Sequence, residues 1–543
     1  MDVVVETKEN TRCVVLQGEN KSLVYENIVD YFEAIVAKYP NNIALSFESE
    51  KITYKELNNK INQLAHFIQE RYINWFQTEI KPNSLIGLYL DRGLNMIVSM
   101  LAVLKSGAAY IPLDIQYPEK RLSSFFEKYS VDFVIANDMF AKQSSVISNQ
   151  KTINLDHDFS NIQVQSHQNP GLRILPTHLA YVIFTSGSSG SPKGVMVSHV
   201  NVCNIVDWVI GYYPVSPKDC FIQIASFTFD LSVWEIFSAL LSGGCLVLTR
   251  PHLYKDPNYL LDLMINNHVT ILGTVPSMFK LLLNSPKIDA LKSLKHVLSC
   301  AEPLTDELYS RISSTFLNTR IYNGYGPTET TVMCTHWLCP KYAKHSKISL
   351  GKPIQNTQMY VLDEKQDAVY PGEIGELYVS GAGITQGYLN QPELTDDCFS
   401  IKEFFPNQST LCYKTGDLVR YDADGHIEFV GRSDEQVKLR GYRIELMEIE
   451  RTLGIHPSIG DCVTVINEID SERHLVAYFT IKNDEGPRKI DPQNLRHFLR
   501  QYLPEYMIPT YFVKLDKIPL NDNGKRDKKS LPIPDHQSRF SMI

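Results

Sequence analysis

The chain has 543 residues, more than one hydrophobic core usually serves, so we expect two or more structural units. Its apolar fraction of 43% and charged fraction of 21% are those of a globular protein and argue against a disordered chain. A net charge of −8 argues against nucleic acid or an anionic membrane as a partner, and ten scattered cysteines without a C-x-x-C pair indicate neither a zinc site nor a disulfide framework.

The first four hundred residues carry the pattern of an α/β fold, in which apolar runs such as 245–248 and 269–272 predict parallel strands between helical patterns. Residues 1–20 lack the apolar core of a signal peptide and predict a frayed tail on a cytoplasmic protein. Apolar residues recur at helical spacing over Tyr25–Tyr39, and Thr53 with Glu56 forms a capping box before a second helix. Residues 84–113 then follow the order strand, helix, strand, which predicts a βαβ unit. Lys105 and Gly107 interrupt this apolar stretch, so we do not expect a membrane span.

A glycine-rich loop follows an apolar strand at 180–184, in the string Phe184-TSGSSGSPKGV-Val195. Glycine lets backbone N–H groups approach phosphate oxygens, the hydroxyls donate to those oxygens, and Lys193 supplies charge. The order G-x-x-x-x-G-K-[ST] of P-loop NTPases is missing, because Pro192 precedes the lysine and Gly194 follows it. A flexible Gly/Ser linker would not start from a buried strand. The loop therefore predicts a polyphosphate site.

This string closely resembles the phosphate loop of the adenylate-forming superfamily, which includes amino-acid adenylation enzymes, acyl-CoA synthetases and luciferases. The resemblance implies an α/β protein: a large N-terminal core of parallel-type sheets with a small β-barrel-like portion over residues 1–433, and a small mobile α+β domain over residues 434–543. It also implies that the β- and γ-phosphates of ATP are bordered by Thr185, Ser186, Gly187, Ser188, Ser189, Gly190 and Lys193.

Asp230 lies in an apolar, aromatic stretch, Phe229–Phe237, at the start of a helical pattern. A buried carboxylate is costly unless it is paired, so this one serves either as a helix N-cap or as the partner of a ligand ammonium. In the amino-acid adenylation enzymes of nonribosomal peptide synthesis, an aspartate at this place binds the substrate α-ammonium, and fatty-acyl and aryl-acid relatives generally lack it. Asp230 therefore favours an amino acid as substrate.

A second string, Ile321-YNGYGPTET-Thr330, combines an aromatic ring, a tight turn and one carboxylate. Tyr325 can stack on a base, and Glu329 can coordinate Mg²⁺, a hard cation that favours oxygen ligands. The resemblance places further nucleotide contacts at Ala301, Glu302, Asn323 and Thr328, and it assigns Asp417 and Arg432 to the ribose hydroxyls.

After about residue 405 the pattern changes to short strands and turns. Gly381–Gly387 superficially resembles a dinucleotide-binding loop, but no strand surrounds the acidic residue expected about twenty positions on, so we predict a structural role. Asp424-Gly425 marks a hairpin. The charged segment Gly431–Glu445 is interpreted as an interdomain linker, and the resemblance places its hinge at Asp434.

Lys525 follows an Asn-Gly turn near the end of the chain. A solvated surface lysine is the ordinary interpretation of such a residue. The resemblance implies instead that Lys525 bridges the substrate carboxylate and the α-phosphate of ATP, so that Asp230 and Lys525 hold the two ends of one zwitterion.

Aligning these anchors with the family implies a pocket for the amino-acid side chain. Apart from Asp230 and Lys525, which serve the α-amino and carboxylate groups, its lining is small or apolar. This disfavours Lys, Arg, Asp and Glu as substrates, because a charged side chain would be buried without a partner. Two glycines add room and two large side chains remove it, so volume leaves proline, valine and leucine open. Resemblance to free-standing prolyl-activating enzymes favours L-proline. The lining residues are Asp230, Leu231, Trp234, Gly273, Leu298, Cys300, Gly324, Val332 and Met333.

The predicted function is activation of an apolar L-amino acid as aminoacyl-AMP with ATP and Mg²⁺, followed by thioester formation on a phosphopantetheinylated carrier protein. The chain ends eighteen residues after Lys525 without a carrier-protein motif, so we expect the carrier to be separate; the alternative is that the chain is a terminal piece of a larger synthetase. The alternatives are an acyl- or aryl-CoA synthetase, which Asp230 disfavours, and a nucleotide-binding regulator without chemistry, which the presence of Lys525, Glu329 and Asp417 disfavours.

Overall fold

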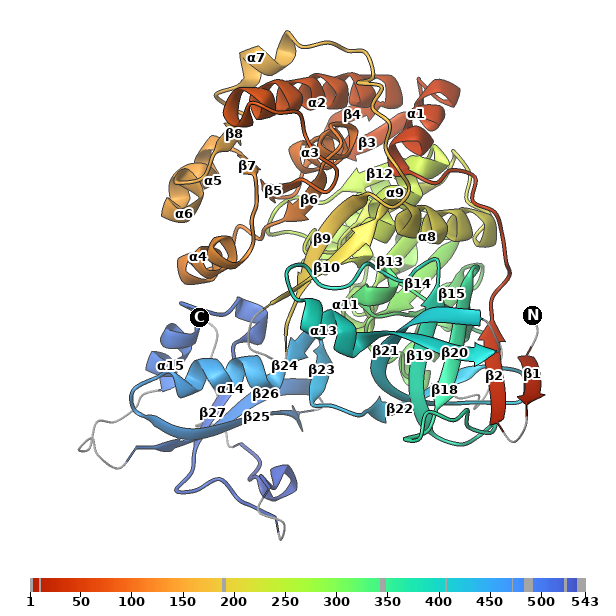
Figure 1. The fold of residues 1–543 in the computed structure, drawn as a ribbon, viewed down its shortest axis with the longest axis vertical. Coiled ribbons are helices and arrows are strands. Elements are labelled where there is room, and N and C mark those ends of the chain that lie inside the picture. The colour runs from red at the N-terminus through yellow and green to blue at the C-terminus, as the bar shows by residue number, and fades with distance from the viewer. Residues whose placement is uncertain are drawn as a thin grey trace. The chain divides into compact units, whose positions relative to one another are not determined.

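The computed structural model describes residues 3–8, 11–187, 192–341, 348–405, 408–470, 472–482, 492–521 and 525–534. The chain, whose fold is shown in Figure 1, forms two compact units. The first contains Met1–Ile115, Ser130–Phe184 and Gly194–Ser433, and the second contains Gln116–Tyr129, Thr185–Lys193 and Asp434–Ile543.

A six-stranded sheet is built around the predicted βαβ unit. The helix α3 (Leu94–Lys105) connects β5 to β6, which pair in parallel as predicted, and Gly107 follows the helix with φ of +90°. The order of strands is β10-β9-β6-β5-β7-β8. Their bounds are β5 (Leu85–Tyr89), β6 (Ala109–Pro112), β7 (Phe133–Ala136), β8 (Thr152–Asn154), β9 (Leu179–Thr185) and β10 (Lys193–Ser198).

A nine-stranded sheet has the order β17-β16-β15-β14-β13-β11-β12-β3-β4. The strands from β15 to β3 pair in parallel, and antiparallel strands close both edges. The predicted strand at 245–248 is β12, whereas the one predicted at 269–272 begins two residues later. The bounds are β3 (Ile43–Phe47), β4 (Glu50–Thr53), β11 (Cys220–Gln223), β12 (Cys245–Leu248), β13 (Ile271–Thr274), β14 (His296–Cys300), β15 (Arg320–Tyr325), β16 (Thr335–Leu338) and β17 (Lys352–Pro353).

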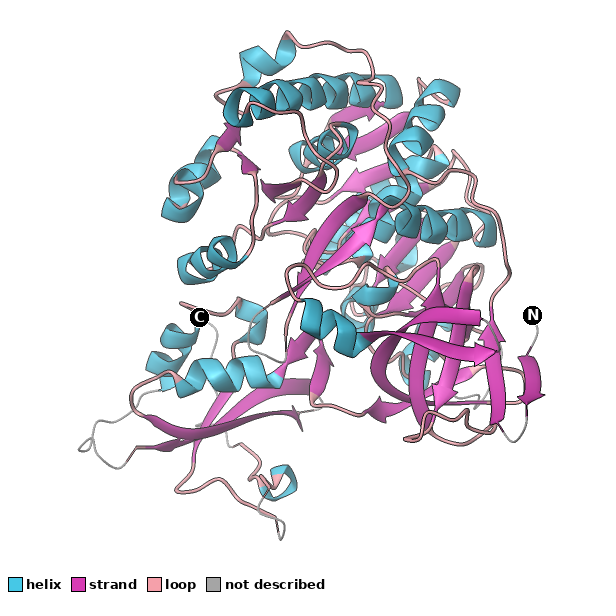
Figure 2. Cartoon of the chain, viewed as in Figure 1, coloured by secondary structure: helices cyan, strands magenta, loops and turns pink. Residues whose placement is uncertain are grey.

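Helices cover both sheets, and Figure 2 shows helices packed beside the strands of this part of the molecule. One apolar core joins residues of both sheets with five helices: α1 (Ile28–Lys38), α2 (Tyr54–Phe76), α3, α8 (His199–Tyr212) and α9 (Leu231–Ser242). The predicted capping box of Thr53 and Glu56 opens α2. A second core packs the nine-stranded sheet against α10 (Pro257–Asn266), α11 (Pro276–Leu283) and α12 (Asp306–Thr315). Shorter helices are α5 (Asp138–Gln143), α6 (Ser145–Ser148), α7 (Phe159–Gln163) and α13 (Pro392–Cys398).

A seven-stranded antiparallel sheet completes the first unit and includes the N-terminal residues. The expectation of a frayed tail is wrong, because β1 and β2 form a hairpin and β2 pairs with β18 through Leu16 and Gln17. The predicted hairpin at Asp424-Gly425 joins β21 to β22. The strands are β1 (Val3–Lys8), β2 (Thr11–Gln17), β18 (Thr357–Leu362), β19 (Gly375–Gly381), β20 (Phe399–Phe405), β21 (Gln408–Tyr421) and β22 (Ile427–Arg432).

The second unit combines a ribbon and a small sheet with helices. The charged segment interpreted as a linker contains the end of β22 and then the ribbon of β23 (Gln436–Leu439) and β24 (Tyr442–Glu445). An apolar core joins this ribbon to the helices and to the sheet β25-β26-β27. The other elements are α4 (Glu119–Lys128), α14 (Leu446–Gly454), α15 (Pro492–Leu499), β25 (Ile459–Ile469), β26 (Glu472–Ile481) and β27 (Tyr511–Lys514). No helix among the described residues combines the length and the apolarity needed to cross a bilayer.

Candidate active site

Asp230 is a buried carboxylate at the N-terminus of α9, with 5% of its surface exposed. It occupies the N-cap position, but its helical φ of −65° and ψ of −21° go with no side-chain bond to the helix N–H groups. The cap alternative is therefore not realised. The positive end of the helix dipole favours a negative charge at this place. Burial raises the pKa of Tyr181 well above its usual range, and the charges of Tyr110 and Asp230 raise it further.

A buried polar network holds the segment that leads into Asp230. The backbone N–H groups of Ile224 and Ala225 donate to the Glu235 carboxylate at 3.1 and 3.2 Å. The Arg92 guanidinium donates to the carbonyls of the same two residues at 2.7 and 2.8 Å and lies 4.0 Å from the centre of the Tyr254 ring. Burial raises the pKa of Glu235 to about 8. These bonds fix both the end of β11 and the first turns of α9.

Three neighbouring parallel strands bring the predicted lining residues together. The register pairs Gly273 of β13 with Leu298 of β14, and Cys300 of β14 with Gly324 of β15. Leu231 and Trp234 come from α9, and both side chains are buried. The lining thus comes from the carboxyl ends of β13, β14 and β15 together with the start of α9, where ligands bind in open α/β sheets.

Gly273 and Gly324 do not enlarge the predicted side-chain pocket as the sequence suggests. A Cβ atom at Gly273 would lie 2.6 Å from Cζ3 of Trp234. One at Gly324 would lie 2.8 Å from Sδ of Met333 and 2.9 Å from Cδ1 of Leu298. The glycines therefore permit close approach of large side chains, and the room they add is taken by their neighbours.

Three residues in the segments that follow β14 and β15 have left-handed backbone conformations. Val332, predicted to line the pocket, has φ of +70°, and the preceding Thr331 has φ of +59°. Ala301, predicted to border the nucleotide, has φ of +66°. Left-handed backbone is costly for residues with a side chain, above all for β-branched ones, and it occurs often at functional sites.

Tyr325, Asp417 and Arg432 are brought together from segments far apart in sequence. The Tyr325 hydroxyl donates to Oδ2 of Asp417, and Arg432 donates to Oδ1 at 2.6 Å. The strands β21 and β22 place Asp417 and Arg432 directly opposite each other. The Tyr325 ring is buried, and burial, followed by the charge of Asp417, raises the pKa of its hydroxyl.

Glu329 lies in the 3₁₀ turn η2 (Thr328–Thr330) and is fully buried. The Tyr388 hydroxyl donates to Oε1 of Glu329 at 2.7 Å. Nearby in sequence, the side-chain amide of Asn323 donates to the carbonyl of Ser349 at 2.8 Å. A single buried carboxylate suits a Mg²⁺ ion that brings most of its oxygen ligands from phosphates and water.

Glu302 has a structural partner in the first unit. Its Oε2 accepts the backbone N–H of Ser277, in the first turn of α11, at 2.9 Å. The carboxylate therefore caps a helix, and its predicted contact with the nucleotide stays a prediction.

The residues predicted to bind phosphate belong to the second unit. The Ser186 hydroxyl donates to the carbonyl of Arg443 at 2.8 Å, and the buried Thr185 hydroxyl has no hydrogen-bond partner among the described residues. Gly187 follows Ser186, and Lys193 is buried at the start of β10. Three predicted residues, Ser188, Ser189 and Gly190, lie outside the described residues.

Lys525 and Asp434 also belong to the second unit. Lys525 is exposed, and its backbone N–H donates to the side-chain oxygen of Asn521 at 3.0 Å. The convergence of Lys525 with Asp230 of the first unit remains a prediction. Asp434 is the first residue of the long C-terminal segment of its unit.

Sequence reasoning missed the side chains that hold Glu329 and the pocket loop. Tyr388 contacts the Glu329 carboxylate across 59 positions, and the Thr331 hydroxyl donates to the carbonyl of Gly383 at 2.7 Å. The available signal is the string Gly381–Gly387, which directly precedes Tyr388 and for which the sequence predicts only a structural role. No local pattern tells which distant carboxylate a tyrosine meets.

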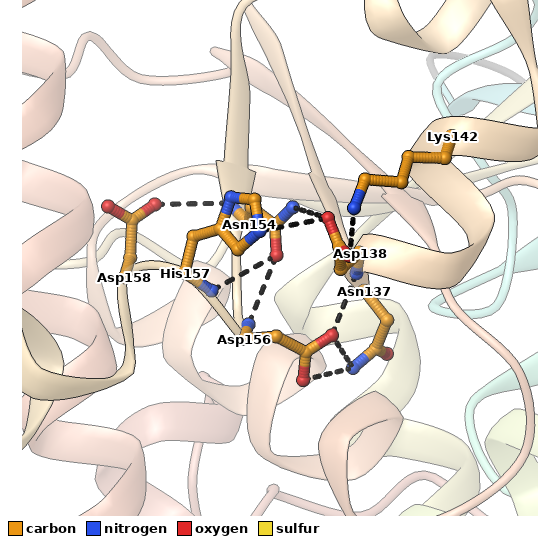
Figure 3. A network of polar contacts seen from close by, with 7 residues as sticks. All are labelled: Asn137, Asp138, Lys142, Asn154, Asp156, His157 and Asp158. Atoms are coloured by element: carbon orange, nitrogen blue, oxygen red, sulfur yellow. Dashed lines mark hydrogen bonds and ion pairs between the residues drawn. The ribbon is translucent and has the colours of Figure 1, made fainter.

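A separate polar network joins the ends of β7 and β8 (Figure 3). The carboxylate of Asp156 accepts the backbone N–H of Asp138, and Asp158 accepts that of Asn154. Lys142 and His157 both contact Asp138, at 2.6 and 3.0 Å. These groups satisfy one another and the strand ends, which indicates a structural role.

Among the described residues, one group of three possible metal ligands lies close together: Asp422, Asp424 and His426, in the turn between β21 and β22. Two of the three are exposed, and the Asp422 carboxylate accepts the backbone N–H groups of Asp424 and His426. The Asp422 carboxylate thus serves to stabilise the turn.

Residues 32–389 match the AMP-binding enzyme family, and residues 448–525 match the AMP-binding enzyme C-terminal domain. The chain is 37% identical to tyrocidine synthase 3 of Brevibacillus parabrevis over its full length, but spans only 8% of that protein.

Solved structures show the same fold. An artificially fused adenylation–PCP di-domain, NpsA-ThdA from Klebsiella oxytoca, is 27% identical with a TM-score of 0.79, covering 90% of this chain and 94% of that one. Holo-AB3403, a four-domain nonribosomal peptide synthetase bound to AMP and glycine, is 29% identical with a TM-score of 0.66, covering 97% of this chain and 38% of that one. The chain belongs to the AMP-binding enzyme family and is an AMP-forming ligase related to the adenylation domains of nonribosomal peptide synthetases.

Proposed function

We propose that this enzyme activates the carboxylate of a compact, uncharged amino acid as aminoacyl-AMP and transfers the aminoacyl group to a carrier-protein thiol. The observation that carries the proposal is the buried Asp230 carboxylate at the start of α9, beside an apolar lining. A buried carboxylate at a helix N-terminus beside apolar side chains suits the α-ammonium of an amino acid, which brings the opposite charge. The related synthetase with bound AMP and glycine supports the same class of substrate.

The first step needs no protein nucleophile. A carboxylate oxygen of the amino acid forms a bond to the α-phosphorus of ATP, and the bond from that phosphorus to the bridging oxygen breaks to release pyrophosphate. The role of the chain is to position both substrates and to offset negative charge. Asp230 would hold the ammonium, Asp417 the ribose hydroxyls, and Lys193 and Lys525 the phosphates and the reacting carboxylate.

Mg²⁺ bound with ATP would offset charge on the phosphates, and Glu329 fits it as a buried oxygen ligand. The Tyr388 hydroxyl fixes one oxygen of that carboxylate. Tyr325 and Arg432 hold Asp417 in a single orientation, so that the oxygens of Asp417 are positioned before a ribose arrives.

The packing of the lining supports a compact side chain for the substrate. Trp234 fills the space above Gly273, and Met333 with Leu298 fills the space above Gly324. L-Proline combines small volume with the absence of a polar side chain, and we propose it as the substrate. Valine and leucine are the comparison substrates.

In the second step the aminoacyl group passes from AMP to the sulfur atom of a carrier-protein thiol. The phosphopantetheine thiol of a carrier protein attacks the carbonyl carbon of the adenylate, a C–S bond forms, and AMP leaves from the same carbon. In this proposal the C-terminal domain turns about Asp434 between the two steps. The bonds of the chain support a hinge there: Ser433 binds the carbonyl of Gly416 in the first unit, whereas Glu435 pairs with Lys528 in the second.

The test is ATP–pyrophosphate exchange with single amino acids, and with fatty and benzoic acids as the comparison. We expect exchange that depends on L-proline and exceeds that with valine, leucine or any acid lacking an amino group. Exchange driven best by valine or leucine contradicts the choice of substrate. Exchange driven by fatty or benzoic acids contradicts amino-acid activation and indicates an acyl- or aryl-CoA synthetase. A Lys525→Ala variant equal to wild type would indicate a nucleotide-binding regulator.

A further inference from the structure

The loop from Gly381 to Tyr388, called here the 381–388 loop, contacts the Glu329 turn through both backbone and side chains. The backbone N–H of Thr385 donates to the carbonyl of Glu329 at 3.1 Å. The Thr331 hydroxyl donates to the carbonyl of Gly383 at 2.7 Å, and the Tyr388 hydroxyl donates to the carboxylate of Glu329 at 2.7 Å. One loop thus holds both the backbone and the carboxylate of Glu329.

The same loop is joined to the strand that leaves the phosphate loop. The N–H of Met196 donates to the carbonyl of Gly387 at 3.0 Å, and the N–H of Leu389 donates to the carbonyl of Gly194 at 2.8 Å. These bonds follow β10, which begins at Lys193. The loop therefore connects the strand that follows the phosphate loop to the turn that carries Glu329.

The first turn of α8 holds the loop from the other side. The side-chain amide of Asn201 donates to the carbonyls of Ala382 and Ile384 at 2.7 and 3.1 Å, while its oxygen accepts the N–H of Ser198 in a capping box. Gly383 lies so close to the Glu329 turn that an added Cβ would stand 2.9 Å from the carbonyl oxygen of Thr330. The loop is therefore held by hydrogen bonds to α8 and by close packing against the Glu329 turn.

We propose that Tyr388 is a positioning residue, which orients the Glu329 carboxylate toward the Mg²⁺ that accompanies ATP. The inference rests on the proposed function, because only an ATP-using enzyme requires this carboxylate to be aimed. Glu329 is fully buried and Tyr388 is 2% exposed, so water does not replace the bond between them. A hydrogen bond to a charged group in such surroundings is stronger than one in water, and it fixes rotation of the carboxylate.

The variant that tests this role is Tyr388→Phe. Its ring retains the contact with Phe399, whose centre lies 5.7 Å away, and only the hydroxyl is lost. Calorimetric titration with ATP in the presence of Mg²⁺ is expected to show about tenfold weaker binding, in line with loss of one hydrogen bond to a charged group. The same titration in EDTA should match wild type. The exchange assay should show a raised KM for MgATP and an unchanged KM for the amino acid.

The matched control is Tyr421→Phe, which also removes a buried hydroxyl, one that donates to the carbonyl of Val369 at 2.7 Å. It should leave Mg²⁺-dependent binding of ATP unchanged. The double variant Tyr388→Phe with Glu329→Gln separates positioning from general destabilisation. If Tyr388 acts through Glu329, the double variant binds MgATP no more weakly than Glu329→Gln alone.

Two outcomes overturn the inference: equal Mg²⁺-dependent affinity in Tyr388→Phe and wild type, or additive losses in the double variant. Failure of the proposed function has a different signature, because wild type would then give no exchange with any amino acid.

Discussion

Asp230 shows how burial turns an ordinary side chain into a candidate binding group. At the start of α9 it takes the N-cap position yet makes no cap bond, and its surroundings are apolar. The network of Arg92 and Glu235 holds the backbone of Ile224 and Ala225 and so fixes the segment that leads to it. A fixed backbone on this side suits a group that must meet a ligand without first rearranging.

Replacing Asp230 by asparagine keeps the size of the side chain and removes its charge. We expect kcat/KM for the amino acid to fall roughly 100-fold, because breaking a buried ion pair costs about 3 kcal/mol. KM for MgATP should change little, and discrimination between the amino acid and its α-hydroxy analogue should shrink. ATP–pyrophosphate exchange with both substrates measures each quantity.

The control for this variant is Asp207→Asn, on α8. Asp207 is also buried, but its carboxylate accepts the backbone N–H of Val24 at 2.7 Å. This variant should keep the wild-type kcat/KM. Asp230→Asn with unchanged discrimination would show that the ammonium is bound elsewhere.

Helices α1, α2 and α3 are joined by a buried lysine rather than by apolar contacts alone. Lys105 is 1% exposed, and its ammonium contacts Glu33 of α1 at 2.8 Å and donates to Asn58 and Asn62 of α2 at 2.7 and 2.9 Å. Burial lowers the pKa of Lys105, and the bond with Glu33 opposes this shift. One cation thus joins three helices.

Lys105→Met should lower the free energy of unfolding by about 3 kcal/mol, because the carboxylate and the amide oxygens lose their common partner. Urea unfolding followed by circular dichroism measures the loss. The control Lys142→Met removes an exposed lysine paired with Asp138, and it should change stability little. A loss no greater than that of the control would show that the buried cation is not a net stabilising contact.

An aromatic cluster on β15, β16 and α8 contains a histidine held in its neutral form. The rings of Trp208, Tyr212, Tyr213 and Tyr322 surround His336 with centres 4.6 to 5.5 Å from it. Its Nε2 has no hydrogen-bond partner among the described residues, and burial lowers the pKa of His336 to about 3.

The stability of the protein should therefore fall on acidification. Between the ordinary histidine pKa near 6.5 and the lowered value, the unfolded chain binds a proton that the folded chain does not, so stability decreases as pH falls below 6.5. His336→Phe should remove about 1 kcal/mol of the difference in unfolding free energy between pH 7 and pH 5.5. Urea unfolding at the two pH values tests this.

His268→Asn is the control for the pH series. His268 is exposed, and its φ of +51° is one that asparagine tolerates. This variant should keep the wild-type dependence on pH. If His336→Phe also keeps it, the buried ring is not the source of the acid sensitivity.

The division of the chain into two units gives the segment around Asp434 its importance. On one side, Arg432 and Ser433 bind Asp417 and Gly416 of the first unit. On the other side, Glu435 pairs with Lys528 of the second unit. The bonding of the chain thus changes from the first unit to the second at Asp434, which supports the proposed hinge between the two reaction steps.

Asp434→Pro should separate the two steps, because proline removes one rotatable backbone angle at the hinge. We expect ATP–pyrophosphate exchange within about twofold of wild type and thioester loading of a carrier protein reduced at least about tenfold. Asp434→Ala, which keeps the rotation, should lose far less of the loading step. Equal losses in both variants would show that the aspartate side chain, and not rotation, is needed.

Much of the fold could be predicted because its signals are local. The capping box of Thr53, the span of α3, the strand β12 and the βαβ unit all depend on residues a few positions apart, whose propensities and periodicity act before any tertiary contact forms. The glycine-rich loop and the family to which it points were recognisable for the same reason.

Other features depend on which distant segments meet. Residues 11–17 form a strand because they pair with β1 and, through Leu16 and Gln17, with β18. Gly273 leaves no room because Trp234 packs on it. Tyr388 contacts Glu329 only when the 381–388 loop is packed against β10 and α8. Local patterns carry no information about such partners, since the free energy of a long-range contact depends on geometry that the complete fold creates.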